Sequence, residues 1–85
     1  MKFKTDTFIC DLKNEVEFAR GKFPEPDGLM TALTEEVGEL AKALLDEPRE
    51  NVYKEAIQVA AMALRVATEG DPTLDQVRIR TGADK

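Results

Sequence analysis

Three glutamates stand close together near the middle of this 85-residue sequence, in the order Glu35, Glu36 and Glu39. On a helix, which turns by about 100° per residue, Glu36 and Glu39 lie about 60° apart and project from one side. Ala32 and Ala43 would lie directly above and below them. The two carboxylates therefore project from a patch of small side chains, which leaves room for a ligand.

A second polar stripe lies in the next segment, where Glu55, Gln58, Met62 and Arg65 recur at helical spacing. Between positions 56 and 67 only Gln58 and Arg65 are polar. Polar groups buried on such a helix need a partner or a ligand, because leaving them unsatisfied is costly. If the two stripes face each other, they gather three carboxylates and one carboxamide, those of Glu36, Glu39, Glu55 and Gln58.

Carboxylates brought this close repel one another unless a cation offsets their charge. The donors are all oxygens, which favour Mg²⁺ first and Mn²⁺ second, and Mg²⁺ completes its shell with water and phosphate oxygens. Lys42, Lys54 and Arg65 are the candidates for contacts to phosphate, with Arg65 preferred because it shares the glutamate stripe. The alternative is structural: Glu35 above all could be solvated, and Arg65 could pair with one of the acids.

Three helices are expected to position these groups, so the fold class is all-α in a single domain over residues 1–85. Apolar positions from Phe8 to Ala19 predict a helix over about 7–23, and two prolines and a glycine interrupt the chain before position 28. A stripe of leucine and valine predicts a helix over 28–46, and an almost wholly apolar pattern predicts a buried one over 49–69. Gly38, inside the second helix, suggests a close-packed neighbour. Residues 72–85 are expected to be short or frayed.

Composition excludes several classes of function. The net charge is −5 and no basic block is present, which argues against nucleic acid and anionic membranes as partners. One cysteine and no histidine exclude most zinc sites and Cys-His or Ser-His catalysis. Charge near the start and the lack of an apolar run of about 20 residues make the cytoplasm the default location. A chain this short buries only about 60–65% of its surface, so we expect a homodimer or homotetramer.

The stretch ALTEEVGELAKALL at 32–45, followed by KEAIQVAAMALR at 54–65, closely resembles the MazG-like branch of the all-α nucleotide pyrophosphohydrolases. That superfamily is marked by an E-E-x-x-E motif on one helix and an E-x-x-D motif on the next. The resemblance covers about residues 18–68. It implies a four-helix bundle assembled from two chains.

The resemblance also implies an activity, the Mg²⁺-dependent hydrolysis of a nucleoside triphosphate to the monophosphate and pyrophosphate. Glu36, Glu39 and Glu55 match metal ligands, and Glu35 matches a leading glutamate that binds metal through water or orients the attacking water. The sequence departs from the pattern at Gln58, where the family has aspartate, so one negative charge is missing. A nucleotide-binding module without turnover and a structural helical dimerisation domain are the alternatives.

Overall fold

The computed structural model describes residues 3–75 and 77, and it confirms an all-helical chain in that part. Its elements are α1 (Thr5–Lys22), α2 (Leu29–Asp46), α3 (Arg49–Glu69) and a short 3-10 turn, η1 (Pro72–Leu74). The helix ends differ from the predicted ones by no more than two residues. Within the described residues, no helix is long and apolar enough to cross a membrane. The expectation for the C-terminal segment falls mostly on residues outside the described ones.

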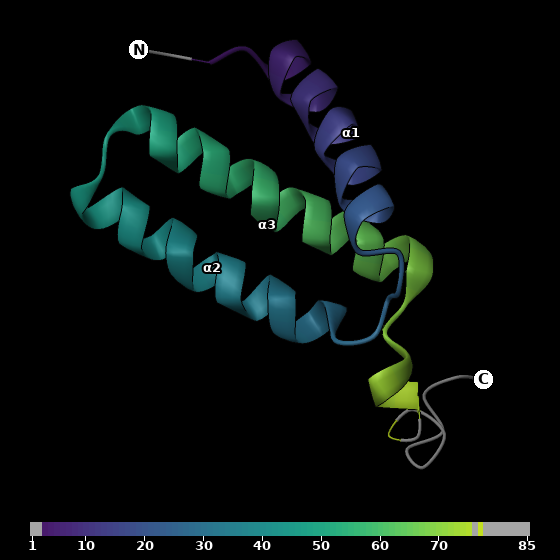
Figure 1. Ribbon diagram of the computed structural model, residues 1–85. Helices are drawn as coiled ribbons and strands as arrows, with labels where there is room; N and C mark the ends of the chain where they lie inside the picture. The colour runs from purple at the N-terminus through teal and green to yellow at the C-terminus, as the bar shows by residue number, and fades with distance from the viewer. Residues whose placement is uncertain (1–2, 76, 78–85) are drawn as a thin grey trace.

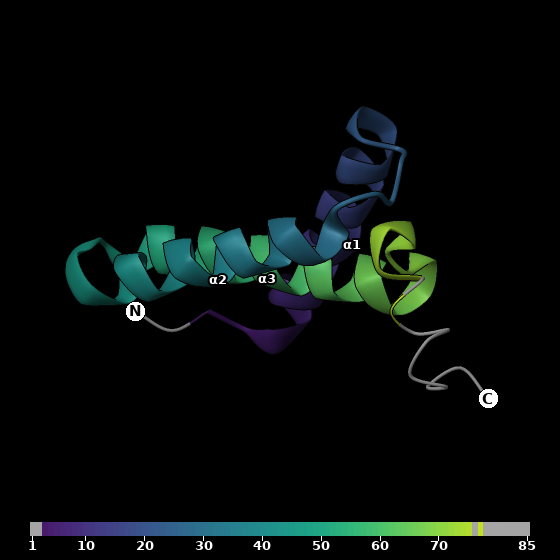
Figure 2. The same cartoon turned by 90° about the horizontal axis from the view of Figure 1, so that it is seen from below.

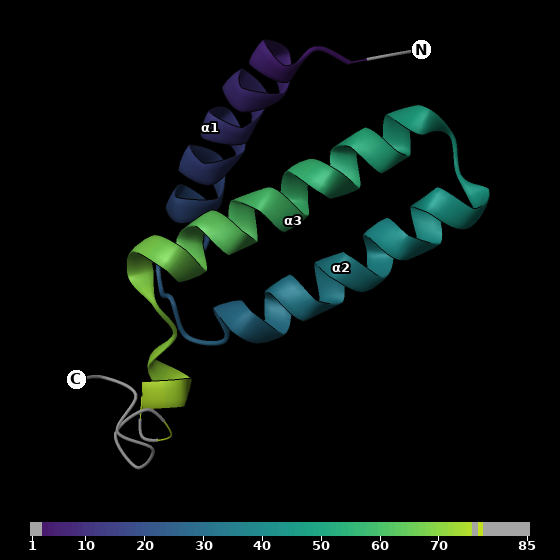
Figure 3. The ribbon, with the colours of Figure 1, turned by 180° about the vertical axis from the view of Figure 1, so that it is seen from behind.

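The helices α2 and α3 form an antiparallel hairpin, in which the two lie side by side along their length (Figures 1 and 3). Only Glu47 and Pro48 separate them in the chain. The first helix is steeply inclined to this pair and crosses it at α3 (Figure 2). Close backbone approaches between helices are found for α2 with α3 and for α1 with α3, and α1 does not closely approach α2 in the described part of the chain.

The small core lies along α3, as its apolar sequence predicted. Ile57 and Ala61 of α3 are buried, and α1 places Val16 and Ala19 against that helix. The α2 side differs from the expected leucine stripe. Its fully buried residue is Ala43, and the exposed fraction reaches 49% for Val37 and 64% for Leu44. Alanines on both helices allow α2 and α3 to pack closely through their small side chains, and this turns part of the leucine stripe away from α3.

The start of α2 is capped by a residue that follows the end of α3. Gly28, with φ of 82°, stands at the N-cap and has no side chain to accept from the first turn. The Asp71 carboxylate, which follows α3, accepts hydrogen bonds from the backbone N–H of Gly28 at 3.0 Å and of Met30 at 2.9 Å. The same carboxylate accepts a 2.7 Å hydrogen bond from the Thr73 hydroxyl. Residues beyond α3 therefore complete the start of α2.

The expected close neighbour of Gly38 is not found. A Cβ added at this position would meet nothing within 4 Å, apart from the helix's own backbone. Gly38 is exposed, because α3 packs against the opposite side of α2. Helix packing within the chain therefore does not require glycine at this position.

Candidate functional site

The α2–α3 interface brings two of the predicted glutamates together, Glu36 and Glu55. Close packing of the two helices leaves both side chains half-buried between them. Burial raises the pKa of Glu36 first of all, and a hydrogen bond to the Glu55 side chain and the charge of Glu55 raise it further. The two carboxyl groups thus meet across the interface, although they come from different helices. We call Glu36 and Glu55 the acid pair.

The other two predicted acids of α2 lie around this pair and are more open to solvent. The charges of Glu39 and then Glu35 raise the pKa of Glu36 as well, so both lie within electrostatic reach. Both side chains are exposed. Among residues 3–75 and 77, no three acidic, histidine or cysteine side chains are close enough to hold a metal ion by themselves. The expected gathering of three carboxylates is therefore not formed by a single chain.

Gln58 and Lys54 lie on the α1 side of α3. Three residues along a helix place Gln58 about 60° around the axis from Glu55. Gln58 and Lys54 line a pocket of about 540 Å³ between α1 and α3, which we call the α1–α3 pocket. Its other lining residues are Phe3, Asp11, Glu15, Glu50, Tyr53 and Ile57. The amide thus faces the α1–α3 pocket, and no hydrogen bond from it to Glu36 or Glu55 is found.

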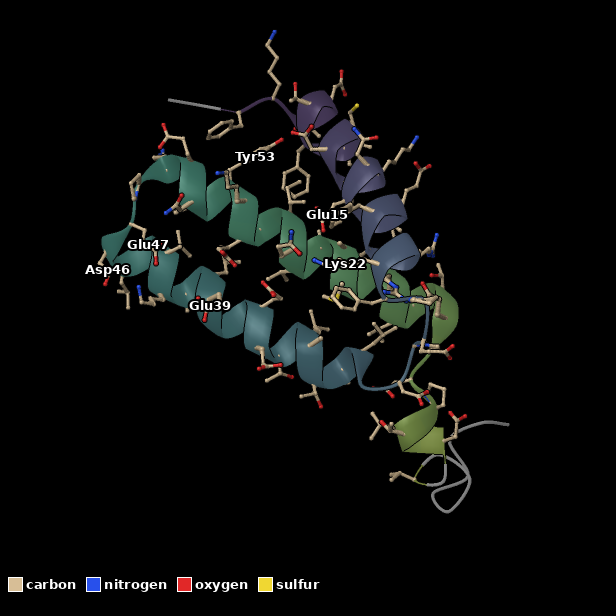
Figure 4. The ribbon with its side chains drawn as sticks, viewed as in Figure 1. Glu15, Lys22, Glu39, Asp46, Glu47 and Tyr53 are labelled. Atoms are coloured by element: carbon tan, nitrogen blue, oxygen red, sulfur yellow. The ribbon has the colours of Figure 1, made fainter. Side chains whose placement is uncertain are left out.

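The α1–α3 pocket is bounded by aromatic rings at its outer end. The rings of Phe3 and Tyr53 lie 4.3 Å apart between centroids, and Phe8 meets Tyr53 edge-on at 5.6 Å. The Tyr53 hydroxyl donates a 2.6 Å hydrogen bond to Asp11, which raises the pKa of Tyr53 to about 12. Tyr53 and Glu15 can be followed in Figure 4. The tyrosine is therefore a link between α1 and α3 and stays protonated at neutral pH.

A second pocket, of about 290 Å³, lies between the α1–α2 loop, the start of α2 and the end of α3. We call it the loop pocket, and its lining residues are Phe23, Glu25, Asp27, Gly28, Leu29, Ala32, Met62 and Arg65. Ala32 precedes Glu36 by one helical turn, and Met62 follows Glu55 by two turns on the same side of α3. The loop pocket therefore lies further along the α2–α3 interface, one turn from Glu36 and two turns from Glu55.

Arg65, predicted to contact phosphate, pairs with Glu69, one turn further along α3. Its side chain is 1% exposed, and Nε and Nη2 donate to the two carboxylate oxygens of Glu69 at 2.9 and 2.8 Å. Arg20 of α1 also donates to Glu69, at 2.8 Å. The hydrogen bonds from Arg65 and then Arg20 lower the pKa of Glu69 to about 2. The sequence analysis missed Glu69, although its i, i+4 spacing from Arg65 is a known pairing signal.

Lys42 also has carboxylate partners. Its ammonium lies 2.9 Å from Glu47 and 3.7 Å from Asp46, at the end of α2 that is distant from the loop pocket (Figure 4). The hydrogen bond to Glu47 raises the pKa of Lys42. Two of the predicted phosphate contacts, Lys42 and Arg65, therefore already form ion pairs with nearby carboxylates.

The donors at the acid pair fit Mg²⁺. Two carboxylates that meet and repel one another would each gain from a divalent cation between them. Mg²⁺ is commonly bound by one or two carboxylates, with water and phosphate oxygens filling the remaining positions. Two protein ligands on adjacent helices are enough for such a site when a phosphorylated substrate is present.

Compared with models of known protein families, with curated proteins and with solved structures, the chain gives no significant match.

Proposed function

We propose that this chain is a Mg²⁺-dependent nucleotide pyrophosphohydrolase, which splits a nucleoside triphosphate into the monophosphate and pyrophosphate. The observation that supports this best is the acid pair, in which Glu36 and Glu55 meet across α2 and α3 beside the loop pocket. A solvated pair of surface glutamates would have no reason to be packed against each other from two helices. The sequence motifs around both residues support the same reaction.

In this proposal each acid has its own part. Glu36 and Glu55 would hold Mg²⁺, while Glu39 would add negative potential beside them. Glu35, which is exposed, would orient the attacking water. When bound, Mg²⁺ or Mn²⁺ would supply charge neutralisation at the phosphate groups and activation of water.

The loop pocket gives the rest of the nucleotide a place beside the metal ligands. Ala32 and Met62 supply small and apolar surface next to the acid pair, and Phe23 supplies an aromatic wall. An apolar cleft with a few polar groups at one end is the usual form of a small-molecule site.

The test is a panel of nucleoside triphosphates assayed for pyrophosphate release with and without Mg²⁺. We expect release by the wild type only with Mg²⁺ or Mn²⁺, and its loss in Glu55→Gln. Glu17→Gln, an exposed acid of α1, is the matched control and should keep full activity. A Glu55→Gln protein with unchanged activity would show that α3 does not contribute to the reaction.

Gln58 supports a second candidate function, a nucleotide-binding module without turnover. The Gln58 amide is uncharged and lies on the α1–α3 pocket. It therefore does not supply the negative charge that the family's aspartate would add beside Glu55. Binding of Mg²⁺ and a nucleotide with no pyrophosphate released would favour the module. Because position 58 faces the α1–α3 pocket, Gln58→Asp should then leave the affinity for Mg²⁺ close to that of the wild type, and tighter binding would show that this side chain reaches the acid pair. If the wild type shows neither binding nor turnover, the remaining alternative is a structural dimerisation domain.

The apolar surface of α2 supports a homodimer as the working form. Met30, Val37 and Leu44 are exposed at intervals of seven residues, and the half-buried Leu33 and Leu40 lie between them. This 3,4 spacing is that of a two-helix seam, in which each helix inserts its apolar residues between those of its partner. We call these five residues the α2 seam. A second copy with the same seam would cover it and form a bundle of four helices from two α2–α3 hairpins.

A further inference from the structure

The proposed substrate carries several negative charges, and most cations near the groove already have acidic partners. Arg65 and Arg20 both bind Glu69, and Lys42 binds Glu47. Lys54 lies on the α1–α3 pocket, eleven residues before Arg65 and so about three helical turns along α3 from the loop pocket. The loop pocket itself has Glu25 and Asp27 in its lining, which would repel phosphate. Binding of a triphosphate there needs a further positive group.

Lys22, the last residue of α1, is placed to supply that charge. Its ammonium lies over two aromatic rings, 5.4 Å from the centroid of Phe23 and 5.7 Å from that of Phe18. Phe23 lines the loop pocket, so the ammonium lies beside a wall of that pocket. In the view of Figure 4, the Lys22 side chain runs from the end of α1 back over α3. Among the described residues, no carboxylate lies within ion-pair distance of it.

The two rings hold the ammonium without neutralising it. A cation over an aromatic face at an exposed site is held only weakly, so it can turn to a phosphate without losing a strong partner. The rings also limit the directions in which a flexible lysine can point. The Lys22 ammonium is thus restrained beside Phe23, one wall of the loop pocket.

We propose that Lys22 contacts the phosphate groups of the bound nucleotide, in the role that the sequence had suggested for Arg65. This inference rests on the proposed function, since it concerns the same substrate. Lys22 contributes to binding the charged chain of the substrate, whereas the acid pair holds the metal. Its loss should therefore weaken the substrate's binding and leave the affinity for Mg²⁺ alone unchanged.

The experiment compares Lys22→Met with the wild type, because methionine keeps an unbranched apolar side chain against the two rings. For Lys22→Met we expect KM for the triphosphate to rise about tenfold with little change in kcat, the pattern of a lost contact that is equal in ground and transition state. Inorganic tripolyphosphate with Mg²⁺ should bind about tenfold more weakly by calorimetry, a loss equivalent to about 1.4 kcal/mol. Lys22→Glu should raise KM further and weaken tripolyphosphate binding further, and Lys22→Arg should restore both quantities. Lys13→Met, at an exposed lysine of the same helix, is the control.

The outcomes separate this inference from the function on which it rests. A wild type that releases pyrophosphate, together with a folded Lys22→Met protein whose KM and tripolyphosphate affinity are unchanged, overturns the role of Lys22 alone. Equal losses in Lys13→Met and Lys22→Met also overturn it, because they would reflect net charge. A wild type that binds neither tripolyphosphate nor any nucleotide overturns both proposals.

Discussion

The carboxylate of Asp71 accepts a 2.9 Å hydrogen bond from the backbone N–H of Met30, so α2 is capped by a residue that follows α3. Helices that begin without a cap leave backbone N–H groups unsatisfied. Here the missing acceptor comes from more than forty positions away in the chain, and it ties both ends of the hairpin to one point.

Asp71→Asn is expected to lower the melting temperature at pH 7 by several degrees. Hydrogen bonds from Thr73 and then from the backbone of Met30 lower the pKa of Asp71 to about 2, below its ordinary value of 3.8. A lowered pKa means that this stabilisation is complete above the ordinary value and is lost as the pH falls towards about 2. Thermal melts from pH 7 to pH 2 should therefore show the wild type and the variant converging in acid. Asp75→Asn, at an exposed position nearby, should melt like the wild type at every pH.

Glu69→Gln should destabilise the chain by about 3–5 kcal/mol, because it leaves the buried guanidinium of Arg65 without a counter-charge. Arg20→Met removes only the half-exposed partner of Glu69 and should cost no more than about 1 kcal/mol. Urea denaturation followed by circular dichroism measures both values. Equal losses in the two variants would contradict the view that the Arg65–Glu69 pair is the structural one.

Glu36→Gln should raise the melting temperature at pH 7 when no metal is present. The pKa of Glu36 is raised in the fold, so its stabilising contribution is complete below the ordinary value of 4.5 and is lost as the pH rises through the folded value. The amide relieves the repulsion from Glu55 at neutral pH, and the gain should vanish near pH 4.

The same variant tests the metal site. Millimolar Mg²⁺ should raise the melting temperature of the wild type, because the cation binds the folded chain alone. Glu36→Gln should lose this response, while Glu17→Gln keeps it. A Mg²⁺ response of the same size in Glu36→Gln would place the cation elsewhere.

Val37→Glu should convert the proposed dimer into a monomer, since it puts a charge in the middle of the α2 seam. Light scattering should give twice 9.5 kDa for the wild type and 9.5 kDa for the variant. Thr31→Glu introduces the same charge at an exposed position outside the α2 seam and should remain dimeric. A monomeric wild type at micromolar concentration would contradict the dimer.

The helices could be predicted closely because their signals are local. Prolines and glycines between apolar runs mark where each helix ends, and the period of Phe8, Leu12, Val16 and Ala19 marks the face of α1 that packs. The rotation of α2 could not be predicted in this way. Its leucine stripe and its alanine side both offer contacts to a partner, and only three-dimensional packing shows that α3 takes the side with Ala43.

The candidate site was predictable in part for the same reason. Once α2 turns its alanine side to α3, Glu36 is carried into the interface and meets Glu55. Gln58 lies about 60° from Glu55 around α3, and which of the two faces α2 depends on the helix rotation. The cap at Asp71 had no signal in the sequence, because it joins residues that are distant in the chain.

In the described part of the chain, α1 closely approaches α3 and not α2, and this has a consequence for how the protein can diverge or be redesigned. Substitutions on α1 and on the loop that follows it reshape the wall around Phe23, and they leave the interface that holds Glu36 against Glu55 untouched. Under the proposed function, selectivity and metal binding would therefore reside in separately adjustable parts of one short chain. A library confined to residues 18–27 should yield altered ligand preferences without loss of the acid pair.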